Sequence, residues 1–175
     1  MKDLNGLRAP LLIFGYGNPS RGDDALGPLL LERLEALNLP HVELLTDFQL
    51  QVEHALDLHD RDRVLFIDAS VSCTAPYAFS LLQPQKDTSY SSHVMSPAAV
   101  LHAYQDMYGT PPSAYLLEVR GKRFELGERL SLEARSNLDA AFSVLKELCA
   151  RPDLHKWGQL SMCPTTPSTG RITEP

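Results

Sequence analysis

The feature that most limits the fold is a glycine-rich loop near the start of the chain. An apolar run over residues 11–14 leads into Gly-Tyr-Gly-Asn-Pro-Ser-Arg-Gly-Asp-Asp-Ala-Leu-Gly, residues 15–27. Leucines at helical spacing follow it, namely Leu26, Leu29, Leu30, Leu34 and Leu37. A strand, a glycine-rich loop and a helix in this order place the loop at the carboxyl edge of a sheet, where open α/β proteins bind their ligands.

The loop ends in two adjacent carboxylates, Asp23 and Asp24. A helix N-terminus favours negative charge, so Asp23 is expected to cap the helix that follows, and Asp24 is then left for chemistry. The loop has Ser20 where a dinucleotide fingerprint has its third glycine, and it lacks the Gly-Lys-Ser/Thr of a P-loop. An acidic loop also repels phosphate, so the sequence favours a cation and leaves a nucleotide-binding module as a minor alternative.

Length and composition narrow the class of protein. The chain has 175 residues, 43% of them hydrophobic, which suits a single domain with a sizeable core. Its net charge is −6 and it has no long basic run, so neither nucleic acid nor a membrane is expected as a partner. We also expect a monomer. Residues 1–9 lack the apolar core of a signal peptide, which predicts a cytoplasmic protein. The three cysteines form no C-x-x-C pair, so neither a zinc site nor a disulfide framework is expected.

Strand and helix patterns alternate along the chain. Strands are expected at residues 10–15, 42–47, 63–68, 78–82 and 114–119. Helices are expected at residues 24–37, 49–58, 96–108 and 131–150, the third with Ser96 as its cap and a proline in its first turn. This alternation predicts one α/β domain over residues 1–150, a three-layer αβα sandwich with a mostly parallel twisted sheet. Residues 151–175 are rich in proline, serine and threonine and are expected to form a flexible C-terminal tail.

Three side chains are candidates for a common site. Asp24 follows the first strand, Asp68 ends the strongly apolar strand at 63–68, and His93 lies in a polar loop just before a capped helix. Because the carboxyl ends of parallel strands meet at one edge of a sheet, Asp24 and Asp68 should be neighbours. Two carboxylates and an imidazole suit a borderline divalent metal such as zinc or nickel.

Other readings of the acidic residues remain open at this point. Response-regulator receiver domains also place acids after the first strand and a phosphorylated aspartate at the end of the third, with Lys122 as a poorly placed partner lysine. Asp68 alone could simply cap a turn. No zincin-type histidine pair is present, because His54 and His59 are five residues apart. One helix face carries several polar residues and is expected to be solvated, namely Glu53, His54, Asp57 and His59.

The order of the motifs resembles that of one known family, the maturation endopeptidases of NiFe hydrogenases. The motifs are Gly15-x-Gly-Asn18, Gly22-Asp-Asp-x-x-Gly27, Ile67-Asp68-Ala69 and Ser-His93 ahead of Ser-Pro. The resemblance covers roughly residues 10–150. It implies an endopeptidase that removes the C-terminal extension of a hydrogenase large-subunit precursor once nickel has been inserted.

The resemblance also assigns roles to residues. By the family pattern, Asp24, Asp68 and His93 contact a nickel ion that belongs to the precursor, and no tightly held cofactor is expected. Many members carry Asp-Gly-Gly-Thr after the second strand, whereas this chain has Thr46-Asp-Phe-Gln-Leu-Gln51, which is similar to the subgroup serving bidirectional, NAD-linked hydrogenases. Asp24 stands where many members have glutamate, which gives a shorter reach to the same cation.

Overall fold

A computed structural model describes residues 8–87, 95–150, 157 and 158, and its centre is a five-stranded sheet. The strands are β1 (Leu11–Tyr16), β2 (Val42–Asp47), β3 (Arg63–Ser70), β4 (Tyr77–Leu82) and β5 (Ser113–Arg120). Their order across the sheet is β2-β1-β3-β5-β4. All neighbours pair in parallel except β4, which runs antiparallel to β5 at one edge. The predicted mostly parallel sheet is confirmed.

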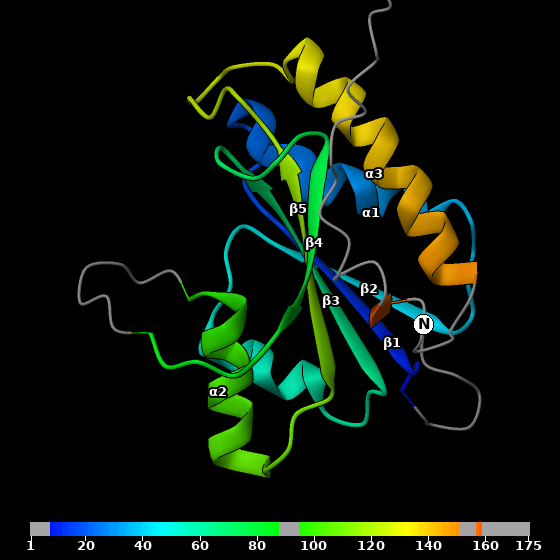
Figure 1. The fold of residues 1–175 in the computed structure, drawn as a ribbon, viewed down its shortest axis with the longest axis vertical. Helices are drawn as coiled ribbons and strands as arrows, with labels where there is room; N and C mark the ends of the chain where they lie inside the picture. The colour runs from blue at the N-terminus through cyan, green and yellow to red at the C-terminus, as the bar shows by residue number, and fades with distance from the viewer. Residues whose placement is uncertain (1–7, 88–94, 151–156, 159–175) are drawn as a thin grey trace, which may run out of the picture.

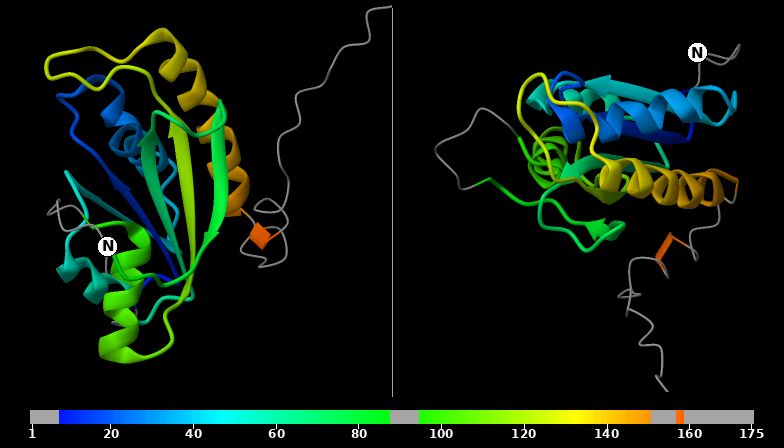
Figure 2. Two further views of the ribbon diagram at one scale, coloured as in Figure 1. Left: turned by 60° about the vertical axis from the view of Figure 1, so that its left-hand side comes forward. Right: turned by 90° about the horizontal axis from the view of Figure 1, so that it is seen from above.

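Helices cover both faces of this sheet (Figure 1). On one face lie α1 (Leu26–Glu35) and α3 (Leu132–Ala150), and on the other lie α2 (Pro97–Tyr108) and the short 3-10 helix η2 (Val52–Leu58). Successive side chains of β1 alternate between the two cores, because a strand points its residues to opposite faces. Two further views show the same three layers (Figure 2). The predicted αβα sandwich is therefore confirmed.

Two of the predicted helices differ from expectation, one in its first turn and the other in its helix type. The helix expected at 24–37 consists of a 3-10 turn, η1 (Gly22–Ala25), followed by α1, and the one expected at 49–58 is the 3-10 helix η2. The start of α1 is set by close packing. A Cβ on Gly27 would lie 2.8 Å from the Tyr16 carbonyl oxygen and 3.0 Å from that of Ile67, so only glycine lets the helix rest on β1 and β3.

The predicted cap of α2 is confirmed. The Ser96 hydroxyl accepts a hydrogen bond from the Ala99 backbone N–H at 3.1 Å, and Pro97 occupies the first helical position. Among the described helices, none combines the length and the apolar character that crossing a bilayer requires.

A tryptophan beyond α3 is part of the core. Trp157 lies within the segment expected to form a tail, and it is fully buried. Its ring packs edge-on against Tyr115 and Phe79, with centroids 5.1 and 6.0 Å away. The Arg63 guanidinium lies over the indole at 4.6 Å from its centroid. Trp157 is therefore attached to the sheet through its side chain.

Candidate functional site

The glycine-rich loop borders a cavity of about 320 Å³ at the carboxyl edge of the sheet. Its lining comes from β1, the loop, the start of η1, the segment after β2 and the end of β3: Tyr16, Gly17, Asn18, Arg21, Asp24, Phe48, Gln49 and Asp68. Asp24 and Asp68 thus line one cavity, at the edge where the strand ends placed them. The third candidate, His93, lies outside the described residues.

The backbone of the loop holds Asp24 in place. The Asn18 N–H donates to Asp24 Oδ2 at 2.8 Å. Gly17 has a φ of 142°, and a Cβ there would collide with the carbonyl oxygen of Asp24. The glycine is therefore required by the close approach of two loop segments, and this approach fixes the position of the carboxylate.

Asp68 sits in an environment that favours its protonated form. Burial raises its pKa to about 6, and the hydrogen bonds from the Tyr16 hydroxyl and the Ala69 backbone only partly oppose this effect. The negative charges of Asp24 and Glu118 raise the pKa of Asp68 further. Two carboxylates near each other in a half-buried cavity repel, so a cation between them would be favoured.

Tyr16 and Asp68 form a direct contact. The Tyr16 hydroxyl donates to Asp68 Oδ2 at 3.1 Å. Burial, followed by the charge and hydrogen bond of Asp68, raises the pKa of Tyr16 well above its usual value of 10, so the hydroxyl keeps its proton and acts as a donor. Tyr16 is a site residue that the sequence analysis missed, because no local pattern shows which carboxylate a tyrosine will meet.

An acid–histidine pair lies at the end of β2, next to the cavity-lining residue Phe48. Asp47, which lies opposite Tyr16 in the β1–β2 register, accepts from the Phe48 N–H at 2.6 Å and lies 3.3 Å from His54 Nε2. The His54 ring packs against Phe14 at 4.6 Å, and its side chain is only 14% exposed. The expectation that His54 belongs to a solvated helix face is wrong. Its Nδ1 accepts from the Gln51 N–H at 2.9 Å, so the histidine helps to cap η2.

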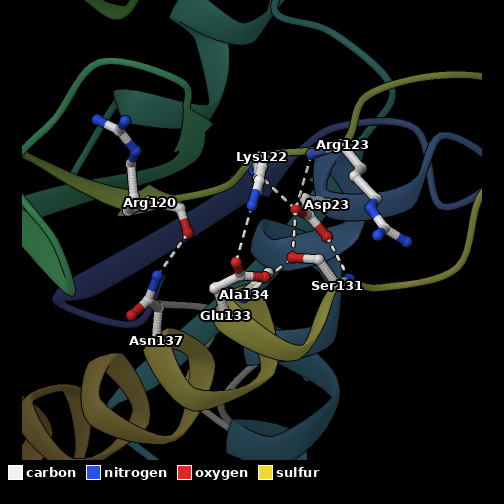
Figure 3. A network of polar contacts seen from close by, with 8 residues as sticks. All are labelled: Asp23, Arg120, Lys122, Arg123, Ser131, Glu133, Ala134 and Asn137. Atoms are coloured by element: carbon white, nitrogen blue, oxygen red, sulfur yellow. Dashed lines mark hydrogen bonds and ion pairs between the residues drawn. The ribbon is translucent and has the colours of Figure 1, made fainter.

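The other acid of the loop, Asp23, has a structural role (Figure 3). It is fully buried, and its two oxygens accept from the Lys122 and Arg123 N–H groups and from the N–H and hydroxyl of Ser131, at 2.7 to 2.9 Å. The expectation that Asp23 caps the helix after it is wrong, because η1 and α1 have no side-chain cap. Instead it holds Ser131, whose hydroxyl accepts from the Ala134 N–H at the start of α3.

The Asp23 contacts join two loops that are distant in sequence. The Asp23 N–H donates to the Arg123 carbonyl at 2.7 Å, and Arg21 Nε donates to the Phe124 carbonyl at 3.0 Å. These hydrogen bonds fix the loop before α1 to the loop before α3. The two adjacent acids therefore have different roles. Asp23 holds the loop through buried hydrogen bonds, and Asp24 lines the cavity.

Replacing Asp23 with asparagine should lower the free energy of unfolding by about 2–4 kcal/mol, because an amide nitrogen would then face buried N–H donors. Burial alone would raise the pKa of Asp23, but the hydrogen bonds from Ser131, Arg123 and Lys122 lower it overall. A lowered pKa means that Asp23 stabilises the fold above its unfolded-state pKa, and that this stabilisation is lost as the pH falls through the folded value. The loss in the variant should therefore be largest near neutral pH and shrink in acid, as urea melts can measure.

Glu133→Gln is the matched control for Asp23. It removes a carboxylate from the same region, where Glu133 makes an exposed ion pair with Lys122 at 2.9 Å. Exposed pairs contribute little to stability, so this variant should melt close to the unmodified protein. Equal stability of both variants would show that the Asp23 contacts do not hold the loop.

The described part of the chain supplies two of the three predicted metal ligands. Within residues 8–87, 95–150 and 157–158, no three His, Cys, Asp or Glu side chains are placed to hold one metal ion. Asp24 and Asp68 supply two carboxylates to one cavity, and these are suitable oxygen ligands for a divalent cation. Lys122, the lysine of the receiver alternative, is ion-paired with Glu133 and does not line this cavity.

Comparison with known proteins identifies the fold. No protein-family model matches the sequence, and no curated protein matches it. The NiFe hydrogenase maturation protease HycI from Thermococcus kodakarensis has a similar structure, with a TM-score of 0.64 and 22% identity over 86% of this chain and 98% of that one. At this identity the likeness establishes the fold alone.

Two structures from Escherichia coli are nearer in sequence. The hydrogenase maturating endopeptidase HybD matches with a TM-score of 0.63 and 25% identity, over 79% of this chain and 91% of that one. An endopeptidase solved in solution matches with a TM-score of 0.61 and 27% identity over the same shares, 79% and 91%. The fold is thus that of a class of endopeptidases.

Within that class, the structures that resemble this chain include hydrogenase maturation proteases. In this chain the fold carries the glycine-rich loop after β1 and Asp68 near the end of β3. The chain therefore has the fold of the hydrogenase maturation proteases.

Proposed function

We propose that this endopeptidase removes the C-terminal extension of a NiFe hydrogenase large-subunit precursor after nickel has been inserted. The observation that carries the proposal is the pairing of Asp24 and Asp68 in one cavity at the loop edge of a hydrogenase maturation protease fold. The segment Thr46–Gln51 points to a precursor of the bidirectional, NAD-linked type, and the protein would act in the cytoplasm.

In this proposal nickel is part of the substrate and serves as its recognition element. Asp24 and Asp68 would contact the nickel ion with carboxylate oxygens, and His93 would add a nitrogen ligand. A cation near Asp68 favours the ionised carboxylate, so its approach would offset the cost of the buried charge and lower the pKa that burial raises to about 6. Recognition of the metal is thus coupled to the charge of the cavity.

The residues of the cavity also limit the chemistry of cleavage. Among the described residues that line it there is no serine or cysteine, so these residues offer no hydroxyl or thiol nucleophile of the triad type. A water molecule held by a carboxylate, with the scissile carbonyl polarised by the metal, fits the side chains that are present. Phe48 lies at the rim and is 67% exposed, which gives the precursor an apolar contact beside the acids.

Incubation with nickel-loaded and nickel-free precursor is the direct test. The nickel-loaded precursor should yield a shortened large subunit, and the nickel-free precursor should stay intact because it lacks the element that the carboxylates contact. Mass spectrometry of the products measures the cleavage and locates the bond. Equal cleavage of both precursors would rule out nickel recognition. No cleavage, together with labelling of Asp68 by a small acyl phosphate, would replace the proposal with the receiver alternative.

A further inference from the structure

The hydroxyl of Tyr16 donates to the carboxylate of Asp68 and not to that of Asp47, its register partner. Tyr16 ends β1 and is the register partner of Asp47 in β2, and its neighbour Gly15 is the partner of Ile67, the residue before Asp68 in β3. The Asp47 carboxylate is already engaged by Phe48 and His54. The Tyr16 hydroxyl bonds to Asp68 Oδ2 instead. The Tyr16 hydroxyl therefore contacts the acid that lines the cavity, while Asp47 has other partners.

The ring of Tyr16 is held rigidly by the core. The residue is 7% exposed and belongs to the core between the sheet and α2. Its ring packs edge-on against Phe14 at 6.4 Å, and Phe14 in turn stacks on Phe66. A ring fixed in this way carries its hydroxyl to a defined point on the cavity wall, and Tyr16 lines the same cavity as Asp24 and Asp68.

We propose that Tyr16 is a positioning residue, whose hydroxyl holds Asp68 Oδ2 so that the other carboxylate oxygen is presented to the nickel of the precursor. The proposal rests on the function proposed above. Carboxylates that ligate metals are commonly held by a hydrogen bond from a second residue, and loss of that residue typically weakens metal affinity 10- to 100-fold. Without the Tyr16 donor, Asp68 would keep only the hydrogen bond from the Ala69 backbone, and its carboxylate would be less firmly oriented toward the precursor.

The phenylalanine variant separates this role from packing. Tyr16→Phe keeps the ring and its contacts with Phe14 and removes only the hydroxyl. The matched control is Tyr104→Phe. Tyr104 is also 7% exposed and in the same core, and its hydroxyl lies 3.4 Å from His59 Nδ1, away from the cavity. Both variants lose one buried tyrosine hydroxyl, but only one of them loses a contact with Asp68.

Steady-state cleavage of nickel-loaded precursor, with nickel-free precursor as a competing inhibitor, tests the proposal. Tyr16→Phe should raise KM for the nickel-loaded precursor by about 10-fold or more, with kcat changed by less than about 3-fold. The inhibition constant of the nickel-free precursor should stay within about 2-fold, because that precursor offers no metal to Asp68. Tyr104→Phe should leave all three constants unchanged.

Each other outcome has a defined meaning. An unchanged KM in Tyr16→Phe, or an equal rise in KM and in the inhibition constant, would overturn the positioning role and leave Tyr16 as a packing residue. A kcat that falls while KM holds would overturn it as well. If the unmodified protein cleaves neither precursor, the proposed function fails and the role of Tyr16 fails with it. Thermal melts of both variants confirm that each is folded.

Discussion

Replacing Asp68 with asparagine should abolish processing of the nickel-loaded precursor and, near neutral pH, make the folded protein more stable. Asparagine keeps the size of the side chain, and its oxygen can still accept from the Tyr16 hydroxyl. It cannot supply a negative charge to a cation. Loss of a charged ligand should reduce kcat/KM by about 1,000-fold or more, measured as the rate at which shortened large subunit appears.

The gain in stability follows from the direction of the pKa shift. Burial raises the folded-state pKa of Asp68 from 3.8 to about 6. In the unmodified protein, protonated Asp68 therefore contributes its full stabilisation of the fold below the unfolded-state pKa. This stabilisation is lost as the pH rises through the folded-state pKa. One pKa unit corresponds to about 1.4 kcal/mol. The free energy of unfolding of the variant, relative to that of the unmodified protein, should therefore rise by about 1–3 kcal/mol as the pH increases from about 3 to about 8. Urea melts across this range measure the difference.

Asp139→Asn is the control for both readouts. Asp139 makes an exposed ion pair with Arg33 on the helix layer, 2.7 Å apart and distant from the cavity. Its replacement should leave processing and the pH dependence of stability unchanged. If Asp68→Asn instead retained processing and melted lower at every pH, Asp68 would be a turn cap and the charge of the cavity would not matter.

The sheet and its loop edge could be predicted because their signals are local. β1 and β3 are continuous apolar runs, as expected for strands buried on both faces, and each ends in residues that break the pattern. Strand ends of a parallel sheet meet at one edge, so the shared cavity of Asp24 and Asp68 followed from their positions alone. The cap of α2 was predicted for the same reason, since Ser96 and Pro97 stand next to each other in the sequence.

Contacts between distant segments could not be predicted in this way. Asp23 is paired with Ser131, which is 108 residues later, and nothing in the loop sequence shows that a second loop will supply its donors. The contact of Tyr16 with Asp68 depends on the strand order, and that of His54 with Phe14 depends on how η2 packs on the sheet. The 3-10 geometry of η2 was missed because its spacing of apolar residues also fits an α-helix. His93 stays a prediction.

Replacing Trp157 with alanine should lower the free energy of unfolding by about 3–5 kcal/mol, the usual cost of removing a large buried aromatic side chain. The indole fills a space between Tyr115 of β5 and Phe79 of β4, and it covers the guanidinium of Arg63 at the start of β3. Three strands of the sheet therefore lose a shared contact in the variant. Thermal or urea unfolding of the full chain measures the effect, and processing at a temperature well below the melt should be retained, since Trp157 does not line the cavity.

Two truncations show whether this side chain attaches the C-terminal segment to the sheet. A chain that ends after Ala150 lacks Trp157, whereas a chain that ends after Gly158 keeps it. The shorter chain should be destabilised at least as much as Trp157→Ala, because it removes the same indole and exposes the apolar surface that the indole covers. Leu132→Ala is the control for loss of an apolar side chain in general, because Leu132 is 82% exposed and should contribute little. If the chain ending after Ala150 melted like the full chain, the indole would add no net stability, and residues 151–175 would act as a dispensable tail.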